Sequence, residues 1–419
     1  MNISKIGNTL RAQIHEFSGK LSPRFSKPIS RFVEQMIYGI TVSQDVKLSN
    51  ISRALEEKIP IKKTEDRLSV NLFKEGLGQE LQEQIIKDGC RRIHKNTLLI
   101  IDPSDLRKEY AKKMECLGIV RDGSKKELCN GYWTLNIIGC ETGAHRITPI
   151  YQSLYSSSAP DFVSENNEIL TAVDMITERT NKRGILVIDR GGDREKLINP
   201  FMNKGLQFII WMTGDRHLTF RGRNRLAEDI AKGCPLWYRE SIVKEDQGEE
   251  KKYHLEFGYR KVRFPGRKEE LWLVVITGFG KKPMMLLTSI PQRKNRSCLW
   301  FVVDGYLTRW RIEEAIRFTK QSYNLEDIRV LRYRRLCNLI VLVLAVNYFA
   351  AVYLGDRLKL SVLTRRVLKS AKRFYGIASF RYYAIADGMA YILRRLGKGP
   401  IVPRIREIEG RQLTFSLSP

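Results

Sequence analysis

Apolar residues recur at helical spacing through the first quarter of the chain. The segment PISRFVEQMIYGI carries an apolar face at Ile29, Phe32, Val33, Met36, Ile37 and Ile40. A polar break separates it from VKLSNISRALEEKIP, whose apolar residues are Val46, Leu48, Ile51 and Leu55. Two short helices around a tight turn are compatible with helix-turn-helix DNA binding, although any small helical bundle shows the same pattern. We expect residues 1–93 to form a helical N-terminal region that binds DNA.

The pattern then changes to short apolar runs that end in an acid. NTLLIID ends at Asp102 and GILVID ends at Asp189, and runs of this kind predict buried strands. Further strands are predicted in GYWTLNIIGCE, HRITPIYQSLYS and LQFIIWM, and helices in ILTAVDMITERTN and DREKLINPFMNKG. This order is typical of a mixed α/β sheet, which places its functional residues at one edge. We expect residues 94–213 to form the first part of such a core, with both aspartates at that edge.

Alternating apolar residues predict an antiparallel β insertion over residues 214–298. KYHLEFGYRKVRF alternates apolar and polar positions, FPGRKEE is typical of a turn, and LWLVVITGF and PMMLLTSI supply return strands. Residues 299–356 follow as the second part of the α/β core. Their run Asn338–Leu354 has 17 residues, which is short for a membrane span of about 20. We interpret it as a buried core helix and expect no membrane partner.

The charge balance indicates a polyanionic partner. The chain has 419 residues, with 73 Lys and Arg against 46 Asp and Glu, a formal net charge of +27. Each phosphate that a protein neutralises releases a condensed counterion, so nucleic acid is the first candidate and an anionic membrane surface the second. The basic C-terminal region, residues 357–419, has 11 Lys or Arg between Arg357 and Lys398. Its interleaved tyrosines suit phosphate-backbone contact, although an ordinary basic helical surface would have the same composition.

The cysteines and the N-terminal segment indicate in which cellular compartment the protein resides. Seven cysteines are widely spaced and form no CxxC pair, which favours a reducing compartment over a zinc finger or a disulfide framework. The N-terminal segment MNISKIGNTLRAQIHEF lacks the apolar stretch of a secretory signal. We therefore expect a cytoplasmic, nucleoid-associated protein.

The segment YLTRWRIEEAIRFTKQ, residues 306–321, carries a stripe of polar side chains. Residues seven apart on a helix return to within about 20° of one another, which aligns Tyr306, Glu313 and Lys320, and Arg309 falls on the same face. One interpretation is an ordinary ion pair between Arg309 and Glu313, worth about 0.2–0.5 kcal/mol. The other is a carboxylate that faces a metal, with cations above and below it that hold phosphates.

The two strand-end aspartates favour the metal interpretation. Asp102, Asp189 and Glu313 cannot share a small volume without a cation, because like charges force protonation. Hard oxygen ligands select Mg²⁺ or Mn²⁺, and two such ions about 3.5–4 Å apart suit an in-line phosphoryl displacement. The remaining acids are interpreted as capping, pairing or surface residues: Asp105 in a loop, Asp193 at a helix start, and Glu314, Glu326 and Asp327 on the surface.

These motifs resemble those of bacterial insertion-sequence DDE transposases. YLTRWRIEEAIRFTK matches their Y-(2)-R-(3)-E-(6)-K signature at Tyr306, Arg309, Glu313 and Lys320. IDRGGDR looks like the second-aspartate block and LLIIDPSD like the first. The resemblance covers roughly residues 95–355. It implies an α/β, RNase H-like catalytic core with a β-rich insertion and helical N- and C-terminal regions, and it implies catalysis and metal ligation by Asp102, Asp189 and Glu313.

The resemblance also implies a reaction. Such enzymes cut an element free at its terminal inverted repeats and join it to target double-stranded DNA, generally as homodimers in the DNA complex. Tyr306, Arg309 and Lys320 correspond to residues that contact phosphates near the cleaved end, and we expect Trp310 to contact DNA as well. Two alternatives stay open: a nuclease of the same fold without strand transfer, and a transposase-derived DNA-binding protein without catalysis.

Overall fold

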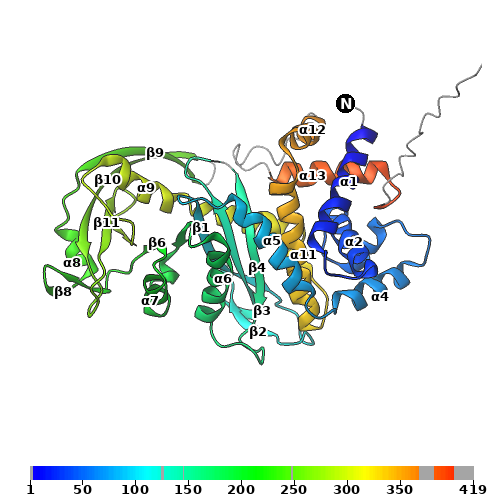
Figure 1. The fold of residues 1–419 in the computed structure, drawn as a ribbon, viewed down its shortest axis with the longest axis horizontal. Coiled ribbons are helices and arrows are strands. Elements are labelled where there is room, and N and C mark those ends of the chain that lie inside the picture. Colours follow the sequence, from blue (N-terminus) through cyan, green and yellow to red (C-terminus); the bar gives the residue numbers. More distant parts are fainter. Residues whose placement is uncertain (1–2, 124–126, 145, 247–248, 368–381, 401–419) are drawn as a thin grey trace, which may run out of the picture.

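Helices fill the N-terminal part of the computed structural model, which describes residues 3–123, 127–144, 146–246, 249–367 and 382–400. They are α1 (Ile3–Leu21), α2 (Lys27–Ser43), α3 (Leu48–Ala54), α4 (Ile61–Leu72), α5 (Leu77–Gly89) and the 3₁₀ turn η1 (Cys90–Arg92). The helical prediction for this region is therefore confirmed. Helices α1, α2, α4 and α5 pack against one or both of two C-terminal helices, α11 (Tyr333–Tyr348) and α13 (Tyr382–Leu396). Together they form the all-helical end of the molecule (Figure 1).

One mixed sheet of ten strands runs through the rest of the molecule, in the order β2-β3-β1-β5-β6-β12-β11-β10-β9, with β4 also paired to β3. The strands of its first half are β1 (Leu98–Arg107), β2 (Gly118–Arg121), β3 (Leu128–Cys140), β4 (Ile147–Tyr155), β5 (Ile185–Ile188) and β6 (Gln207–Trp211). Strand β3 runs antiparallel to β1, whereas β1, β5 and β6 are parallel neighbours. The predicted mixed α/β architecture is confirmed; β2 and the extension of β1 beyond Asp102 were not predicted.

Helices cover both faces of this sheet, because its central strands are apolar on both sides. Along β1, Leu98 and Ile100 join one core cluster, and Leu99 and Ile101 join the other. The first cluster includes residues of α9 (Arg296–Leu307), α10 (Trp310–Ser322) and α11. The second includes residues of α6 (Glu165–Thr180) and α7 (Glu195–Asn203). A side chain on β1 therefore faces either the α9–α10 layer or the α6–α7 layer according to its parity.

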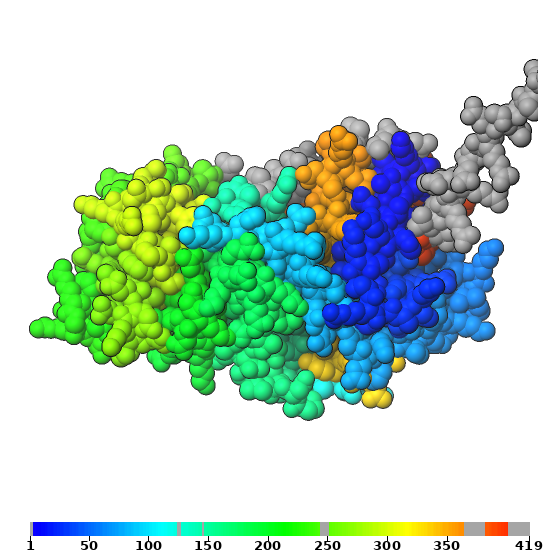
Figure 2. All heavy atoms as spheres, viewed as in Figure 1, coloured from blue at the N-terminus to red at the C-terminus, as the bar shows by residue number. Residues whose placement is uncertain are grey.

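The segment over residues 214–298 is β-rich, as predicted, and is continuous with the main sheet. It contains β7 (His217–Phe220), β8 (Arg223–Leu226), α8 (Ala227–Lys232), β9 (Tyr238–Asp246), β10 (Glu249–Val262), β11 (Leu271–Thr277) and β12 (Met284–Thr288). Strand β12 pairs antiparallel with β6, so β9–β12 extend the ladder of the core strands. Strands β7 and β8 form a separate two-stranded sheet. Figures 1 and 2 show this β-rich part at the end of the molecule opposite the N-terminal helices.

The long apolar run forms a core helix, as predicted. Helix α11 continues as the π-helical turn η4 (Phe349–Tyr353), and the combined stretch has the length and hydropathy of a membrane span, yet 83% of its most apolar window is buried inside the protein. Helix α12 (Asp356–Val367) follows, before α13. Residues 368–381 and 401–419 of the predicted basic region, Tyr375 included, lie outside the described residues.

Candidate active site

Strand register places Asp102 and Asp189 next to each other. The parallel pairing of β1 with β5 matches Ile101 with Ile188, so the next residue on each chain is an aspartate. Neighbouring strands lie about 4.8 Å apart, and residues in register project to the same face. By parity that face is the one covered by α9 and α10. Asp189 does end its strand, as predicted, whereas Asp102 lies within β1, which continues to Arg107.

The side chain of Asp189 is also tied to its own loop. Its carboxylate accepts a 2.8 Å hydrogen bond from the Gly191 amide and caps the short 3₁₀ turn η2 (Arg190–Gly192). The bond closes a short turn between Asp189 and Gly191, and it therefore fixes the direction of the Asp189 carboxylate. One oxygen of Asp189 is thus held by backbone.

Glu313 enters the site from the α9–α10 junction. The predicted single helix over residues 306–321 is wrong, because α9 ends at Leu307 and α10 begins at Trp310. Thr308, in the two-residue break between them, donates its hydroxyl to the Asp304 carbonyl at 2.8 Å. Glu313 then lies in the first turn of α10 with 46% of its side chain exposed.

Arg309 lies between two of the three candidate ligands. Its guanidinium is 2.5 Å from Glu313 Oε1 and 4.0 Å from Asp102 Oδ2. Only 16% of its side chain is exposed, against 18% for Asp102. Burial raises the pKa of Asp102 to about 7; Arg309 opposes that rise, and Asp189 and Glu313 add to it. Asp189 and Glu313 are therefore close enough to act on Asp102 electrostatically, and Arg309 is the cation beside Asp102 and Glu313.

The donor set fits a hard divalent cation in chemistry but is not assembled around one position. Among the residues that the structure describes, no group of three or more His, Cys, Asp or Glu side chains has the geometry to hold a metal ion. The side chain of Arg309 stands where a cation would neutralise Asp102 and Glu313. A bound ion would need that guanidinium to move, since like charges repel.

Tyr306 and Trp310, both predicted to contact DNA, lie in different environments. Tyr306 is 5% exposed and packs edge-on against Trp211, with ring centroids 6.0 Å apart; burial raises the pKa of its phenol to about 12. Trp310 is 38% exposed. The Arg190 guanidinium lies over the Trp211 ring, with its carbon 4.2 Å from the ring centroid. Tyr306 is therefore a buried support for the site, and Trp310 is available at the surface.

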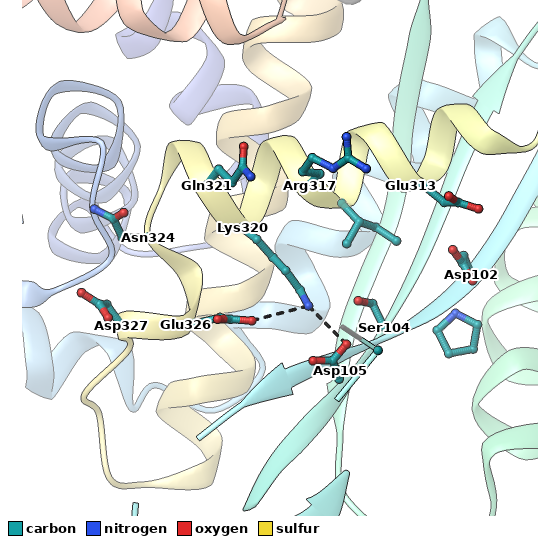
Figure 3. A pocket seen from close by; sticks show the side chains of 13 residues that line it. Asp102, Ser104, Asp105, Glu313, Arg317, Lys320, Gln321, Asn324, Glu326 and Asp327 are labelled. Atoms are coloured by element: carbon teal, nitrogen blue, oxygen red, sulfur yellow. Dashed lines mark hydrogen bonds and ion pairs between the residues drawn. The ribbon is translucent and has the colours of Figure 1, made fainter. Parts of the chain in front are cut away.

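An open groove of about 650 Å³ leads from the acids along α10. Figure 3 shows Asp102 and Glu313 close together at one end of it, while Lys320 reaches between Asp105 and Glu326. The ammonium of Lys320 lies 3.4 Å from Asp105 and 3.6 Å from Glu326. The predicted loop position of Asp105 is wrong, because the residue lies within β1. Lys320 thus lines the groove as a partly neutralised cation.

Two other acids differ from their predicted roles. Asp193 does not begin a helix: its fully buried carboxylate accepts hydrogen bonds from the Thr213 amide and hydroxyl and from Arg216 Nε, at 2.8, 2.7 and 2.9 Å. Its interpretation as a pairing residue holds. Glu314 is not a surface acid but is 3% exposed, paired with Arg317 at 2.9 Å. Neither replaces a candidate ligand.

The sequence did not reveal that Trp211 packs beside Tyr306 at the candidate site, with Arg190 over the Trp211 ring. Arg190 follows Asp189 directly, and Trp211 ends β6, one strand away. The signal that could have found them is the position of each at the carboxyl end of a parallel strand, next to the predicted acids.

Comparison with known sequences yields no match: no protein-family model matches the chain, and no curated protein matches it. Among solved structures, the chain is similar to the cryo-EM structure of a piggyBac transposase synaptic complex with hairpin DNA. The TM-score is 0.44 at 12% identity, over 94% of this chain and 80% of that chain. A similarity of this size says nothing about the chemistry of the site, so the function has to be argued from the residues themselves.

Proposed function

We propose that this protein is a DDE transposase that cleaves DNA at transposon ends and joins the freed end to target DNA. The observation that carries the proposal is the proximity of Asp102 to both Asp189 and Glu313, with Arg309 between Asp102 and Glu313. Strand register brings the first two together, and the third, with Arg309, comes from the signature segment. In this proposal β4-β3-β1-β5-β6 is the RNase H-like core, since three antiparallel strands precede two parallel ones in that order.

Asp102, Asp189 and Glu313 would hold Mg²⁺ or Mn²⁺, with two ions in the active complex. When bound, such ions stabilise negative charge on the attacking and leaving oxygens of a phosphodiester. The contribution of the chain itself is positional. Arg309 can exchange its contact with Glu313 for a DNA phosphate, which a guanidinium binds in a bidentate manner.

Lys320 and Trp310 would extend the DNA contact along the groove. Lys320 holds a charge beside Asp105 and Glu326 that a phosphate can share, and exposed Trp310 can stack on an unpaired base. Binding of duplex DNA by the N-terminal helices and by the basic C-terminal region, and a homodimer in the DNA complex, belong to the same proposal.

The deciding experiment is end cleavage and strand transfer with the inverted repeats that flank the coding region as substrate, in Mg²⁺. Glu313→Gln should lose at least about a thousandfold in cleavage, because a ligand carboxylate becomes a neutral amide. Glu326→Gln, in the same groove, is the matched control and should retain cleavage within a few-fold. Equal cleavage by Glu313→Gln and wild type would refute the assignment. Cleavage without joined products would favour the nuclease, and binding without cleavage the non-catalytic alternative.

A further inference from the structure

The β7–β8 hairpin of the insertion carries three exposed arginines at its tip. Arg221 occupies the turn, and Arg223 and Arg225 alternate along β8. Strand register pairs Arg223 with Phe220 and Arg225 with Leu218, so these side chains share one side of the ribbon. Figure 1 shows β8 at the end of the molecule farthest from the N-terminal helices.

The turn of the hairpin places the positively charged side chain of Arg221 at the tip. Arg221 and Gly222 have φ of +50° and +78°, as a two-residue type I′ turn requires, and Asn or Asp is the usual first residue of that turn. An arginine accepts this left-handed conformation less readily. The Phe220 ring supports the apex, with the Arg221 and Arg260 guanidinium carbons 5.3 and 5.6 Å from its centroid.

The root of the ribbon is anchored to the insertion. Leu218 is completely buried, and Thr219 exchanges backbone hydrogen bonds of 2.8 and 3.0 Å with Arg263. Nearby cations are neutralised: Lys261 and Arg263 lie 2.6 and 3.6 Å from Glu270. Across the described ranges of the chain, by contrast, Arg221, Arg223 and Arg225 contact no carboxylate within ion-pair distance. The ribbon therefore carries uncompensated positive charge at exposed positions of its turn and of β8.

We propose that the β7–β8 ribbon is a second duplex-binding element, which holds the phosphate backbone of double-stranded DNA away from the acidic site. This inference rests on the proposed function for its choice of polyanion. A two-stranded ribbon fits the roughly 12 Å width of the major groove, and arginines spaced two apart along β8 match successive phosphates along a strand edge.

The test is salt-dependent binding of a labelled random-sequence 30-base-pair duplex to the full chain, measured in EDTA so that catalysis plays no part. Arg223→Ala/Arg225→Ala should bind roughly tenfold more weakly at 0.15 M NaCl. The slope of log affinity against log salt should fall by about 1–2, since each lost phosphate contact removes about 0.9. The matched control is Lys281→Ala/Lys282→Ala, which removes the same charge from exposed positions elsewhere in the insertion and should leave the slope near that of wild type.

Arg223→Lys/Arg225→Lys separates charge from folding, because it keeps both cations. Binding like that of wild type supports the ribbon. Lysine variants as weak as the alanine pair, or alanine and control pairs with equal slopes, would overturn it. If wild type binds duplex and the alanine pair binds equally well, the ribbon proposal fails alone and the cleavage result stands. If wild type binds no duplex, the proposed function fails with it.

Discussion

The guanidinium of Arg309 lies 2.5 Å from Glu313 Oε1 and 4.0 Å from Asp102 Oδ2, so one cation serves two acids of the candidate site. Such a residue competes with any metal that needs the same carboxylates. Arg309 could also leave these two acids, because a DNA phosphate would offer its guanidinium another negatively charged partner. If the protein binds metal and DNA as proposed, the two events are coupled, and each should strengthen the other by the same factor.

Arg309→Ala should therefore bind Mn²⁺ severalfold more tightly than wild type when DNA is absent. A partly exposed ion pair is worth up to about 1 kcal/mol, and about 1.4 kcal/mol is a factor of ten. Titration calorimetry or Mn²⁺ electron paramagnetic resonance measures the change. Arg332→Ala is the control, because Arg332 pairs with the exposed Glu115 instead. Unchanged or weaker Mn²⁺ affinity in Arg309→Ala would contradict the competition.

Lys320→Ala should weaken binding to a terminal-repeat duplex roughly tenfold and reduce the salt slope by about 0.9, the value for one phosphate contact. The loss also leaves Asp105 and Glu326 without their shared cation, which makes the groove more acidic. Fluorescence anisotropy in EDTA gives both quantities. Lys232→Ala, whose lysine pairs with Asp229 on α8, should bind as wild type does. A Lys320→Ala protein with wild-type affinity would remove Lys320 from the DNA contacts.

Asp193→Ala should lower the free energy of unfolding by about 3–5 kcal/mol, because it leaves Arg216 without its buried partner. The carboxylate also holds the Thr213 amide and hydroxyl. Urea denaturation followed by circular dichroism measures the loss. The comparison is Asp174→Ala, which breaks the half-exposed pair with Lys204 and should cost at most about 1 kcal/mol. Similar losses in the two variants would argue against a buried anchor.

Lys108 makes stability depend on pH in the alkaline range. Burial lowers the pKa of this lysine to about 8 from 10.5, and its ammonium donates to the Ile328 carbonyl at 2.8 Å and to the Glu326 carbonyl. Between about pH 8 and 10.5 the unfolded chain binds more protons than the folded one, so stability rises with pH in that window. Below pH 8 both states are charged and the full cost of burial is present.

The variant Lys108→Gln removes this dependence while keeping a hydrogen-bond donor. Relative to it, wild type should gain about 2 kcal/mol in unfolding free energy between pH 8 and 10, by the linkage relation. Urea midpoints of both proteins at the two pH values supply the difference, and titrations common to both proteins cancel. A difference that stays constant with pH would show that Lys108 titrates normally.

The core strands that lead into Asp102 and Asp189 could be predicted, because strands buried on both faces have a recognisable sequence pattern. Leu98–Ile101 and Ile185–Ile188 are continuous apolar runs, the pattern of strands covered on both sides. Their register could not be predicted, since it depends on how the whole sheet pairs. That register, rather than the end of each strand, is what sets Asp102 beside Asp189.

The helix that carries Glu313 was predicted less well. Helical spacing aligned Arg309 with Glu313, and the two are in contact. The break at Thr308 and Arg309 could not be predicted, because the helical spacing of the side chains continues across it. The burial of Glu314 was missed for a related reason: the polar pattern of α10 does not show which side the core covers.

The continuous hydrogen-bonded sheet from β1 through β12 to β9 fixes the distance between the acids and the insertion. Strand β6 bonds to β5 on one side and to β12 on the other, so the acids and the insertion cannot slide past each other without breaking strand pairing. If DNA binds at both places as proposed, the two bound stretches would be held at a set spacing and angle. The sheet would then fix the relative position of the two DNA-binding places. The geometry of the DNA complex would be set by the folded protein itself and not by the binding of DNA.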